Sequence, residues 1–171
     1  MDNQNDIPFI EIQRFRQVWL WVLLIMVSLL LFGSIIFVIV VSPKLLMFLM
    51  FVGPIFTLLG LGLPIFFYII KMTTEIDNEG IHLYVFPLAK EYITFQSILS
   101  VEKRIYRPIA EYGGWGVRHS SKGKAFNISG DQGVQLELVI GEKVLIGSQR
   151  ADEMATIIRS NLTSQDKAAS V

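Results

Sequence analysis

The chain has 171 residues, 52% of them hydrophobic, with a mean hydropathy of +0.51 and a formal charge of zero. These values exclude an ordinary soluble composition and a strongly basic chain, and we expect no nucleic-acid partner. The chain has no cysteine, which excludes disulfides, thiolate zinc sites and cysteine nucleophiles. The apolar residues are concentrated before Lys71, whereas the remainder carries twelve basic and twelve acidic residues. The composition therefore predicts a membrane part followed by a globular part.

Two apolar runs follow a charged leader, residues 1–17, which we expect to be a cytoplasmic segment. Val18 to Val41 contains 24 residues and Leu45 to Ile70 contains 26, none of them charged. At about 1.5 Å of rise per residue, each run exceeds the roughly 20 residues that cross a bilayer as a helix. A signal peptide is disfavoured because its apolar core is only about 7–15 residues long. A buried core helix is disfavoured because about 100 globular residues cannot cover two helices that are apolar on every face.

Only Ser42-Pro43-Lys44 separates the two runs. So short a connection predicts an antiparallel transmembrane hairpin over residues 18–70, with both chain ends on one side of the membrane. Arg14, Arg16 and Lys71 flank the outer ends of the runs, against Lys44 alone in the turn, which predicts that both termini are cytoplasmic. Glycines and prolines in the second run predict bends and a close helix contact, either within the hairpin or in an oligomer. The oligomeric state stays open.

After Lys71 the hydrophobic period changes to two, which predicts a β-rich domain over residues 71–162. Gly80 suits a turn between the first two strands, and Gly141-Glu142 predicts a two-residue type II′ turn between the last two. The predicted strands are Met72–Asp77, Ile81–Phe86, Lys90–Phe95, Leu99–Tyr106, Val134–Ile140 and Lys143–Ile146.

An amphipathic helix is predicted from about Arg150 to Leu162, with Ser148 as its cap. Acidic residues in its first turn favour the helix dipole. Its apolar stripe comprises Ala151, Met154, Ala155, Ile158 and Leu162. Residues 163–171 are small and polar, and we expect them to be a disordered tail.

The order of elements resembles that of prokaryotic membrane proteins in which two N-terminal helices precede a pleckstrin-homology-like (PH-like) domain, most of them uncharacterised. The resemblance is carried by Thr74–Ile81, by Ile93–Val101 and by the last hairpin with Gly147-Ser148-Gln149-Arg150 before the helix. It implies a membrane α-hairpin plus an α+β soluble domain. That domain would be a bent β-sandwich, or partly open barrel, of about seven strands capped by the C-terminal helix. The resemblance implies no catalytic residue.

A segment rich in glycine, aromatic and basic residues, Tyr106 to Gly133, interrupts the strand pattern. One interpretation is a flexible rim that binds an anionic lipid headgroup or an acidic segment of a partner protein, because arginine forks match phosphate and the domain is held near an anionic leaflet. The alternative is that the glycines supply turns, Trp115 fills the core and the basic side chains form a solvated edge. The candidate binding residues are Arg107, Trp115, Arg118, Lys122 and Lys124.

The sequence contains no pattern that predicts an enzyme. The phosphate-binding loop motif is absent, and His82 and His119 lie in different segments, so we expect no catalytic residue, no metal site and no cofactor. We expect instead a non-enzymatic membrane protein whose PH-like domain binds a protein or a lipid at the cytoplasmic surface of the cell membrane. The alternative is an accessory subunit of a larger transport or envelope complex, suggested by the broken second helix.

Overall fold

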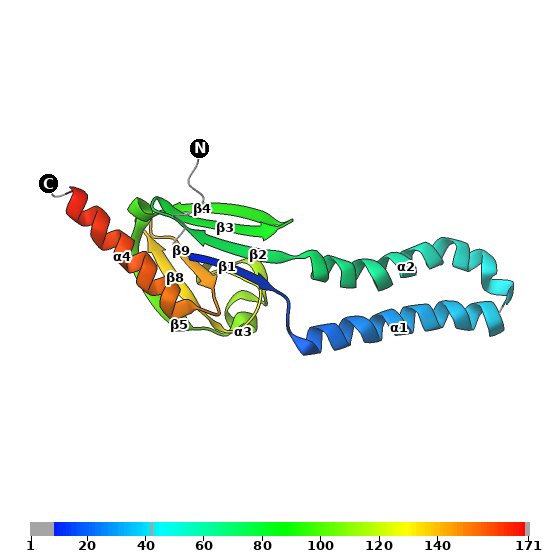
Figure 1. Cartoon of the computed structure of the whole chain (residues 1–171). Coiled ribbons are helices and arrows are strands. Elements are labelled where there is room, and N and C mark those ends of the chain that lie inside the picture. Colours follow the sequence, from blue (N-terminus) through cyan, green and yellow to red (C-terminus); the bar gives the residue numbers. More distant parts are fainter. Residues whose placement is uncertain (1–8, 42, 170–171) are drawn as a thin grey trace, which may run out of the picture. The chain divides into compact units, whose positions relative to one another are not determined.

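The computed structural model describes residues 9–41 and 43–169, which divide into two compact units, Phe15–Ile69 and the remainder (Figure 1). The described residues form nine strands, four α-helices and two short 3₁₀ turns. In chain order these are β1 (Phe9–Arg14), α1 (Val18–Val41), η1 (Pro43–Leu45), α2 (Leu46–Ile69), β2 (Lys71–Ile76), β3 (Gly80–Phe86), β4 (Ala89–Thr94), η2 (Phe95–Ser97), β5 (Ile98–Ile105), α3 (Pro108–Tyr112), β6 (Gly116–Ser120), β7 (Gly123–Asn127), β8 (Gln132–Leu138), β9 (Lys143–Gly147) and α4 (Ala151–Ala169).

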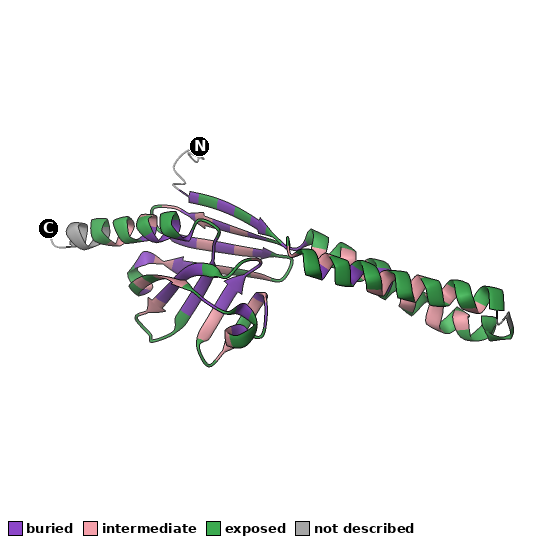
Figure 2. Cartoon of the chain, turned by 90° about the horizontal axis from the view of Figure 1, so that it is seen from below, coloured by how far each residue is buried: buried purple, intermediate pink, exposed green. Residues whose placement is uncertain are grey.

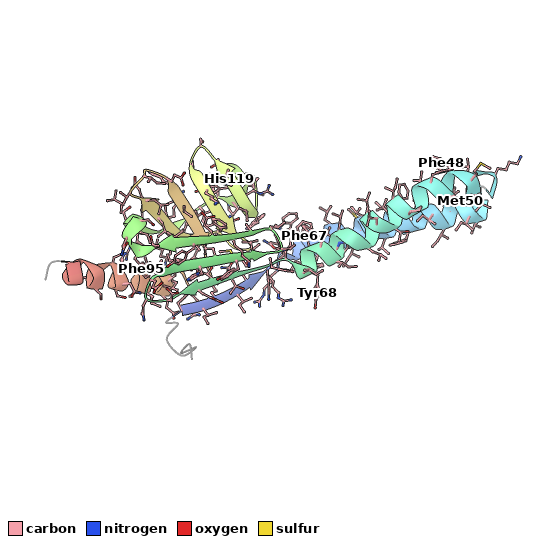
Figure 3. All side chains as sticks on the ribbon, turned by 90° about the horizontal axis from the view of Figure 1, so that it is seen from above. Phe48, Met50, Phe67, Tyr68, Phe95 and His119 are labelled. Atoms are coloured by element: carbon pink, nitrogen blue, oxygen red, sulfur yellow. The ribbon has the colours of Figure 1, made fainter. Side chains whose placement is uncertain are left out.

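The first unit is a pair of helices, α1 and α2, each long and apolar enough to cross a membrane. Only 6% of the most apolar window of each helix is buried, which is the opposite of a core helix in a soluble protein (Figure 2). Large apolar side chains such as Phe48 and Met50 project from α2 with exposed fractions of 59% and 77% (Figure 3). The predicted helical pair is therefore confirmed, with the second helix preceded by η1.

The two helices contact each other through small and polar groups near their middle. The Oγ atom of Ser28 lies 2.6 Å from the carbonyl oxygen of Gly60 on the other helix. A Cβ atom on Gly60 would lie 3.1 Å from the ring of Phe32, so glycine allows this close approach. The helix α2 runs through Pro54 and Pro64. The predicted close contact at the glycines thus occurs within the hairpin.

The second unit contains a four-stranded antiparallel sheet in the order β1-β2-β3-β4 (Figure 1). The predicted hairpin of β2 and β3 is confirmed. The strand β1 was not predicted, because residues 1–17 were expected only to be a charged cytoplasmic segment preceding the first helix. It pairs with β2 from Phe9 opposite Ile76 to Arg14 opposite Lys71, so the helical hairpin is inserted between two neighbouring strands of one sheet. Residues 1–8 lie outside the described residues.

The other sheet has the strand order β5-β8-β9-β7-β6, antiparallel except for the pair β7 and β9. Helix α4 packs against β5, β8 and η2. It buries four residues of the predicted stripe, Ala151, Met154, Ala155 and Ile158, whereas the fifth, Leu162, is half-buried. Ser148 accepts a hydrogen bond from the backbone N–H of Arg150 and donates one to Glu11 of β1. Between the sheets the core is closed by strand residues that are fully buried, including Met72, Leu83, Phe126, Leu136 and Ile146.

Two local predictions are wrong. The turn between β8 and β9 is not a two-residue type II′ turn. The N–H of Gly141 donates to the carbonyl oxygen of Leu138, and the N–H of Leu138 donates to the carbonyl oxygen of Glu142. The loop closed by these two bonds contains Val139, Ile140 and Gly141. Gly141 has φ +84°, so this is a three-residue loop with glycine in the left-handed position. The tail predicted as disordered is helical as far as Ala169, as a continuation of α4. Residues 170–171 lie outside the described residues.

Candidate functional site

The segment between β5 and β8 leaves the sheet and returns to it, forming α3, β6 and β7 rather than the flexible rim predicted from the sequence. The backbone N–H of Tyr106 donates to the carbonyl oxygen of Asp131 at 2.8 Å, which joins the two ends of this excursion. Pro108 begins α3, where its missing N–H costs no hydrogen bond. Gly113 ends α3 with φ +71°, and its N–H bonds to the carbonyl of Ile109.

Helix α3 lies over the outward face of the five-stranded sheet, the face that points away from the core. Tyr112 of α3 is buried together with Tyr106, Ala125 and Leu145, and the two tyrosine rings meet edge to face at 6.2 Å. Burial raises the pKa of Tyr106 to about 12, so its phenol stays protonated at neutral pH. This small second core holds α3 in place against the sheet.

Beside α3 the same face is hollowed into a groove of about 820 Å³, which we call the polar groove. Its walls are the β6–β7 and β8–β9 turns, and its floor is formed by β5 and β8. Polar and charged side chains predominate. The lining residues are Glu102, Arg104, His119 to Lys124, Gln135 and Gly141 to Lys143.

The floor of the polar groove is organised by the ion pair of Arg104 with Glu111 of α3. Arg104 also donates to the amide oxygen of Gln135 at 3.2 Å, and Lys122 reaches Glu111 at 3.2 Å. The pKa of Glu111 is held below its ordinary value by the backbone N–H of Arg107, and further by Lys122 and Arg104, against the opposing effect of burial. The carboxylate is therefore ionised and shared among three donors at neutral pH.

The five residues predicted to form a binding rim do not form one site. Lys122 and Lys124 both line the polar groove. Each is paired with a carboxylate, Lys122 with Glu111 and Lys124 with Glu91, the latter at 2.6 Å.

Arg107, Trp115 and Arg118 do not line the groove. Arg107 precedes α3, while the Nε atom of Arg118 donates to the carbonyl of Trp115 at 3.0 Å. Trp115 is half-buried and donates its indole N–H to the carbonyl of Gly130 at 3.0 Å. The role of these five residues in binding stays a prediction.

Sequence reasoning missed three residues that organise the groove: Arg104, Glu111 and Gln135. Gln135 alternates with the core residues Val134 and Leu136, which places it on the outward face, yet only 8% of it is exposed because α3 lies over that face. Arg104 follows the same alternation on the neighbouring strand. The sequence does show that Arg104 and Gln135 are polar residues on the outward faces of two predicted strands. Only the pairing of β5 with β8 shows that they lie close together.

Donors and acceptors are nearly balanced in the groove. The basic residues that line it are Arg104, Lys122, Lys124 and Lys143. The acidic residues that line it are Glu102 and Glu142, and Glu111 lies beside the groove as the partner of Arg104. Among the described residues no cluster of three His, Asp or Glu side chains could hold a metal ion. Such a surface suits a ligand with several hydrogen-bonding groups of both kinds better than a dense anion.

The comparison with known proteins identifies a family. A model of a family of unknown function, DUF6141, matches residues 1–165, so the chain belongs to that family. No curated protein and no solved structure matches the chain.

Proposed function

We propose that this DUF6141 protein is a non-enzymatic, membrane-tethered binding module. Its two helices span the cell membrane, and its β domain, a PH-like fold, presents the polar groove to a partner at the cytoplasmic surface. The membrane premise rests on two long helices whose apolar side chains are exposed along almost their whole length. Such a surface is unfavourable in water and favourable in hydrocarbon.

The pairing of β1 with β2 carries the proposal. These strands flank the hairpin in sequence, and Arg14 lies directly opposite Lys71 at its two ends. A chain that enters and leaves the membrane through neighbouring strands of one sheet has its domain on one side only. The basic residues Arg14, Arg16 and Lys71 lie on that side, against Lys44 in the opposite turn, which favours the cytoplasm.

The strand order supports a PH-like fold with two insertions. Without α3, β6 and β7, the second sheet reduces to the antiparallel series β5-β8-β9. Together with β1 to β4 this makes seven strands followed by the helix α4, the order that a PH-like domain has. The transmembrane hairpin would then be inserted after the first strand, and the groove-forming excursion after the fifth.

The chemistry of the groove favours a protein segment as its ligand. Three of its four lysine and arginine side chains, those of Arg104, Lys122 and Lys124, are already paired with carboxylates, so a lipid phosphate that bound them would have to displace Glu111 or Glu91. A peptide offers amides and side chains of both signs, which match a groove lined by both. Recognition of such a segment needs no reaction and no cofactor.

Photo-crosslinking in the membrane of intact cells tests the proposal. A photoreactive residue is placed in the full chain at Ser121 in the groove, at Gly53 on α2, or at the exposed Thr156 on α4 as the matched control. We expect a discrete protein adduct at Ser121 that is absent at Thr156 and is lost when Arg104→Gln is added. The absence of any adduct at Ser121 beyond the control would contradict the groove as a binding site.

The photoreactive residue at Gly53 tests the alternative, that the protein is an accessory subunit of a larger membrane complex. Nothing lies within 4 Å of a Cβ atom at Gly53, so this part of α2 is open to another membrane helix. A stoichiometric adduct at Gly53 with none at Ser121 would favour an accessory subunit of a larger membrane complex and would overturn the proposed module.

A further inference from the structure

The outward face of the four-stranded sheet differs from the polar groove in that none of the described helices packs against it. Three rows of side chains cross it, set by the strand register. The row nearest the helical hairpin in sequence is Arg14, Lys71 and Phe86; the second is Ile12, Thr73, Tyr84 and Lys90; the third is Ile10, Glu75, His82 and Tyr92. We call the first row, with the adjoining Pro87, Leu88 and Lys90, the proximal patch.

The cations of the proximal patch meet no counter-charge in the part of the chain that the structure describes. Arg14 and Lys71 face each other directly across β1 and β2, an arrangement of like charges that costs stability. Neither they nor Lys90 forms an ion pair with a described carboxylate. All three side chains are exposed. Cations held together without a counter-charge among the described residues form a surface that favours an anion.

Exposed apolar side chains lie beside these cations. Phe86 and Leu88, at the turn between β3 and β4, are 54% and 51% exposed. They line a hollow of about 590 Å³ together with Lys71, Tyr84 and Lys90. An apolar tip flanked by lysines has the composition of a segment that enters the interface of a bilayer.

Chain connectivity keeps this patch near the membrane. Lys71 follows the last residue of α2 by two positions, a reach of at most about 7 Å. Phe86 pairs with Lys71, so its Cα atom adds only about 5 Å. Acidic residues are placed at the far end of the same strands, Glu75 in β2 and Asp77 and Glu79 in the turn that follows it. The sheet is thus basic at the membrane end and acidic at the distant end.

We propose that the proximal patch docks on the bilayer, with Phe86 and Leu88 inserted among the headgroups and Arg14, Lys71 and Lys90 binding the phosphates of anionic phospholipids. This site is separate from the polar groove and rests on the membrane-spanning part of the proposed function. Docking would hold the domain in one orientation relative to the membrane, so that it no longer rotates about its connection to the helices.

Single-cysteine labelling of the reconstituted full chain tests the docking, because the chain has no cysteine of its own. An environment-sensitive fluorophore is attached at Leu88→Cys, at Glu79→Cys as the distal control, or at Leu29→Cys within α1. Glu79 lies roughly 20 Å from Phe86 along β3, on an exposed turn. The vesicles contain phosphatidylcholine with or without phosphatidylglycerol, and carry nitroxide quenchers in the headgroup or in the acyl chain.

In anionic vesicles we expect the headgroup nitroxide to quench the label at Leu88→Cys strongly and the label at Glu79→Cys little. Equal quenching at the two positions would overturn the inference. The label at Leu29→Cys should be quenched by the acyl-chain nitroxide. If it is not, the spanning hairpin itself fails, a result distinguishable from failure of the patch alone.

Charge variants test the phosphate contact. Each lysine at an anionic surface changes the ratio of docked to undocked protein roughly fivefold, so Lys71→Gln with Lys90→Gln should lower it roughly 25-fold. Lys103→Gln with Arg159→Gln removes the same charge from β5 and α4, away from the proximal patch, and should leave quenching at Leu88→Cys unchanged. Quenching that is the same in neutral vesicles, or insensitive to the loss of Lys71 and Lys90, would overturn binding to anionic lipid.

Discussion

The two sheets of the domain use their basic residues in opposite ways. Around the polar groove of the five-stranded sheet, Arg104 and Lys122 are paired with Glu111, and Lys124 is paired with Glu91. Helix α3 lies over part of the outward face of this sheet. On the outward face of the four-stranded sheet, Arg14 and Lys71 face each other and meet no described carboxylate. The basic residues of the two sheets therefore differ in whether a carboxylate of the same domain neutralises them.

The difference teaches how to separate structural charges from binding charges. A cation whose carboxylate partner comes from the same domain contributes to folding, and removing it leaves that partner uncompensated. A cation that directly faces another cation destabilises the fold slightly, and an external anion would relieve that repulsion. Measurements of stability can therefore test an assignment that was made from geometry.

The largest effect is expected for Glu111→Gln, which leaves the half-buried Arg104 without its counter-charge. We expect a loss of about 1 to 2 kcal/mol in the free energy of unfolding of the domain. Denaturant unfolding of the full chain in detergent measures it, followed by the fluorescence of Trp115 in a variant with Trp19 and Trp21 replaced by Phe. No loss of stability would show that the groove is not organised by this pair.

The same variant has a predicted pH dependence. The pKa of Glu111 is lowered in the folded protein, so its stabilising effect is complete above the ordinary value of 4.5 and is lost as the pH falls through the lowered pKa. The difference in unfolding free energy between the wild type and Glu111→Gln should accordingly shrink toward zero in acid. Unfolding curves at neutral and acidic pH measure it, and a difference that does not change with pH would contradict the ionised pair.

A smaller effect is expected for the pair of Lys124 and Glu91, whose side chains are 24% and 35% exposed. A double-mutant cycle with Lys124→Gln and Glu91→Gln should give a coupling of about 0.5 to 1 kcal/mol, because water screens a partly exposed pair. The four unfolding midpoints provide the measurement. A coupling near zero would mean that Lys124 is available to a ligand in the groove, and would weaken the contrast between the two sheets.

The smallest effect has the opposite sign. Lys71→Gln removes the repulsion with Arg14 and should stabilise the domain by a few tenths of a kcal/mol in detergent, in the absence of anionic lipid. Thermal unfolding of the full chain in a neutral detergent measures it, with Lys103→Gln as the control that should destabilise by breaking the pair with Asp152. A loss of stability in Lys71→Gln would place Lys71 among the structural cations.

The sequence predicted correctly those elements whose hydrophobic pattern lies within one continuous segment of the chain. The bounds of α1, the β2–β3 hairpin and the apolar stripe of α4 agree with the structure. Strand β1 was missed because its pattern is inverted: Glu11 and Gln13 point inward, whereas Ile10 and Ile12 are exposed. The inward glutamate is satisfied by Ser148 and by the backbone N–H of Gln149, partners that lie at the other end of the chain.

The sequence by itself determined that the chain has two apolar helices joined by a very short turn and followed by a β-rich domain, because hydrophobicity and period are local properties. Only the tertiary structure decided that the domain begins before the helices, that α3 covers one sheet, and that Arg14 meets Lys71. These features depend on pairings between segments far apart in the chain. Their free energy comes from partners that no local window contains.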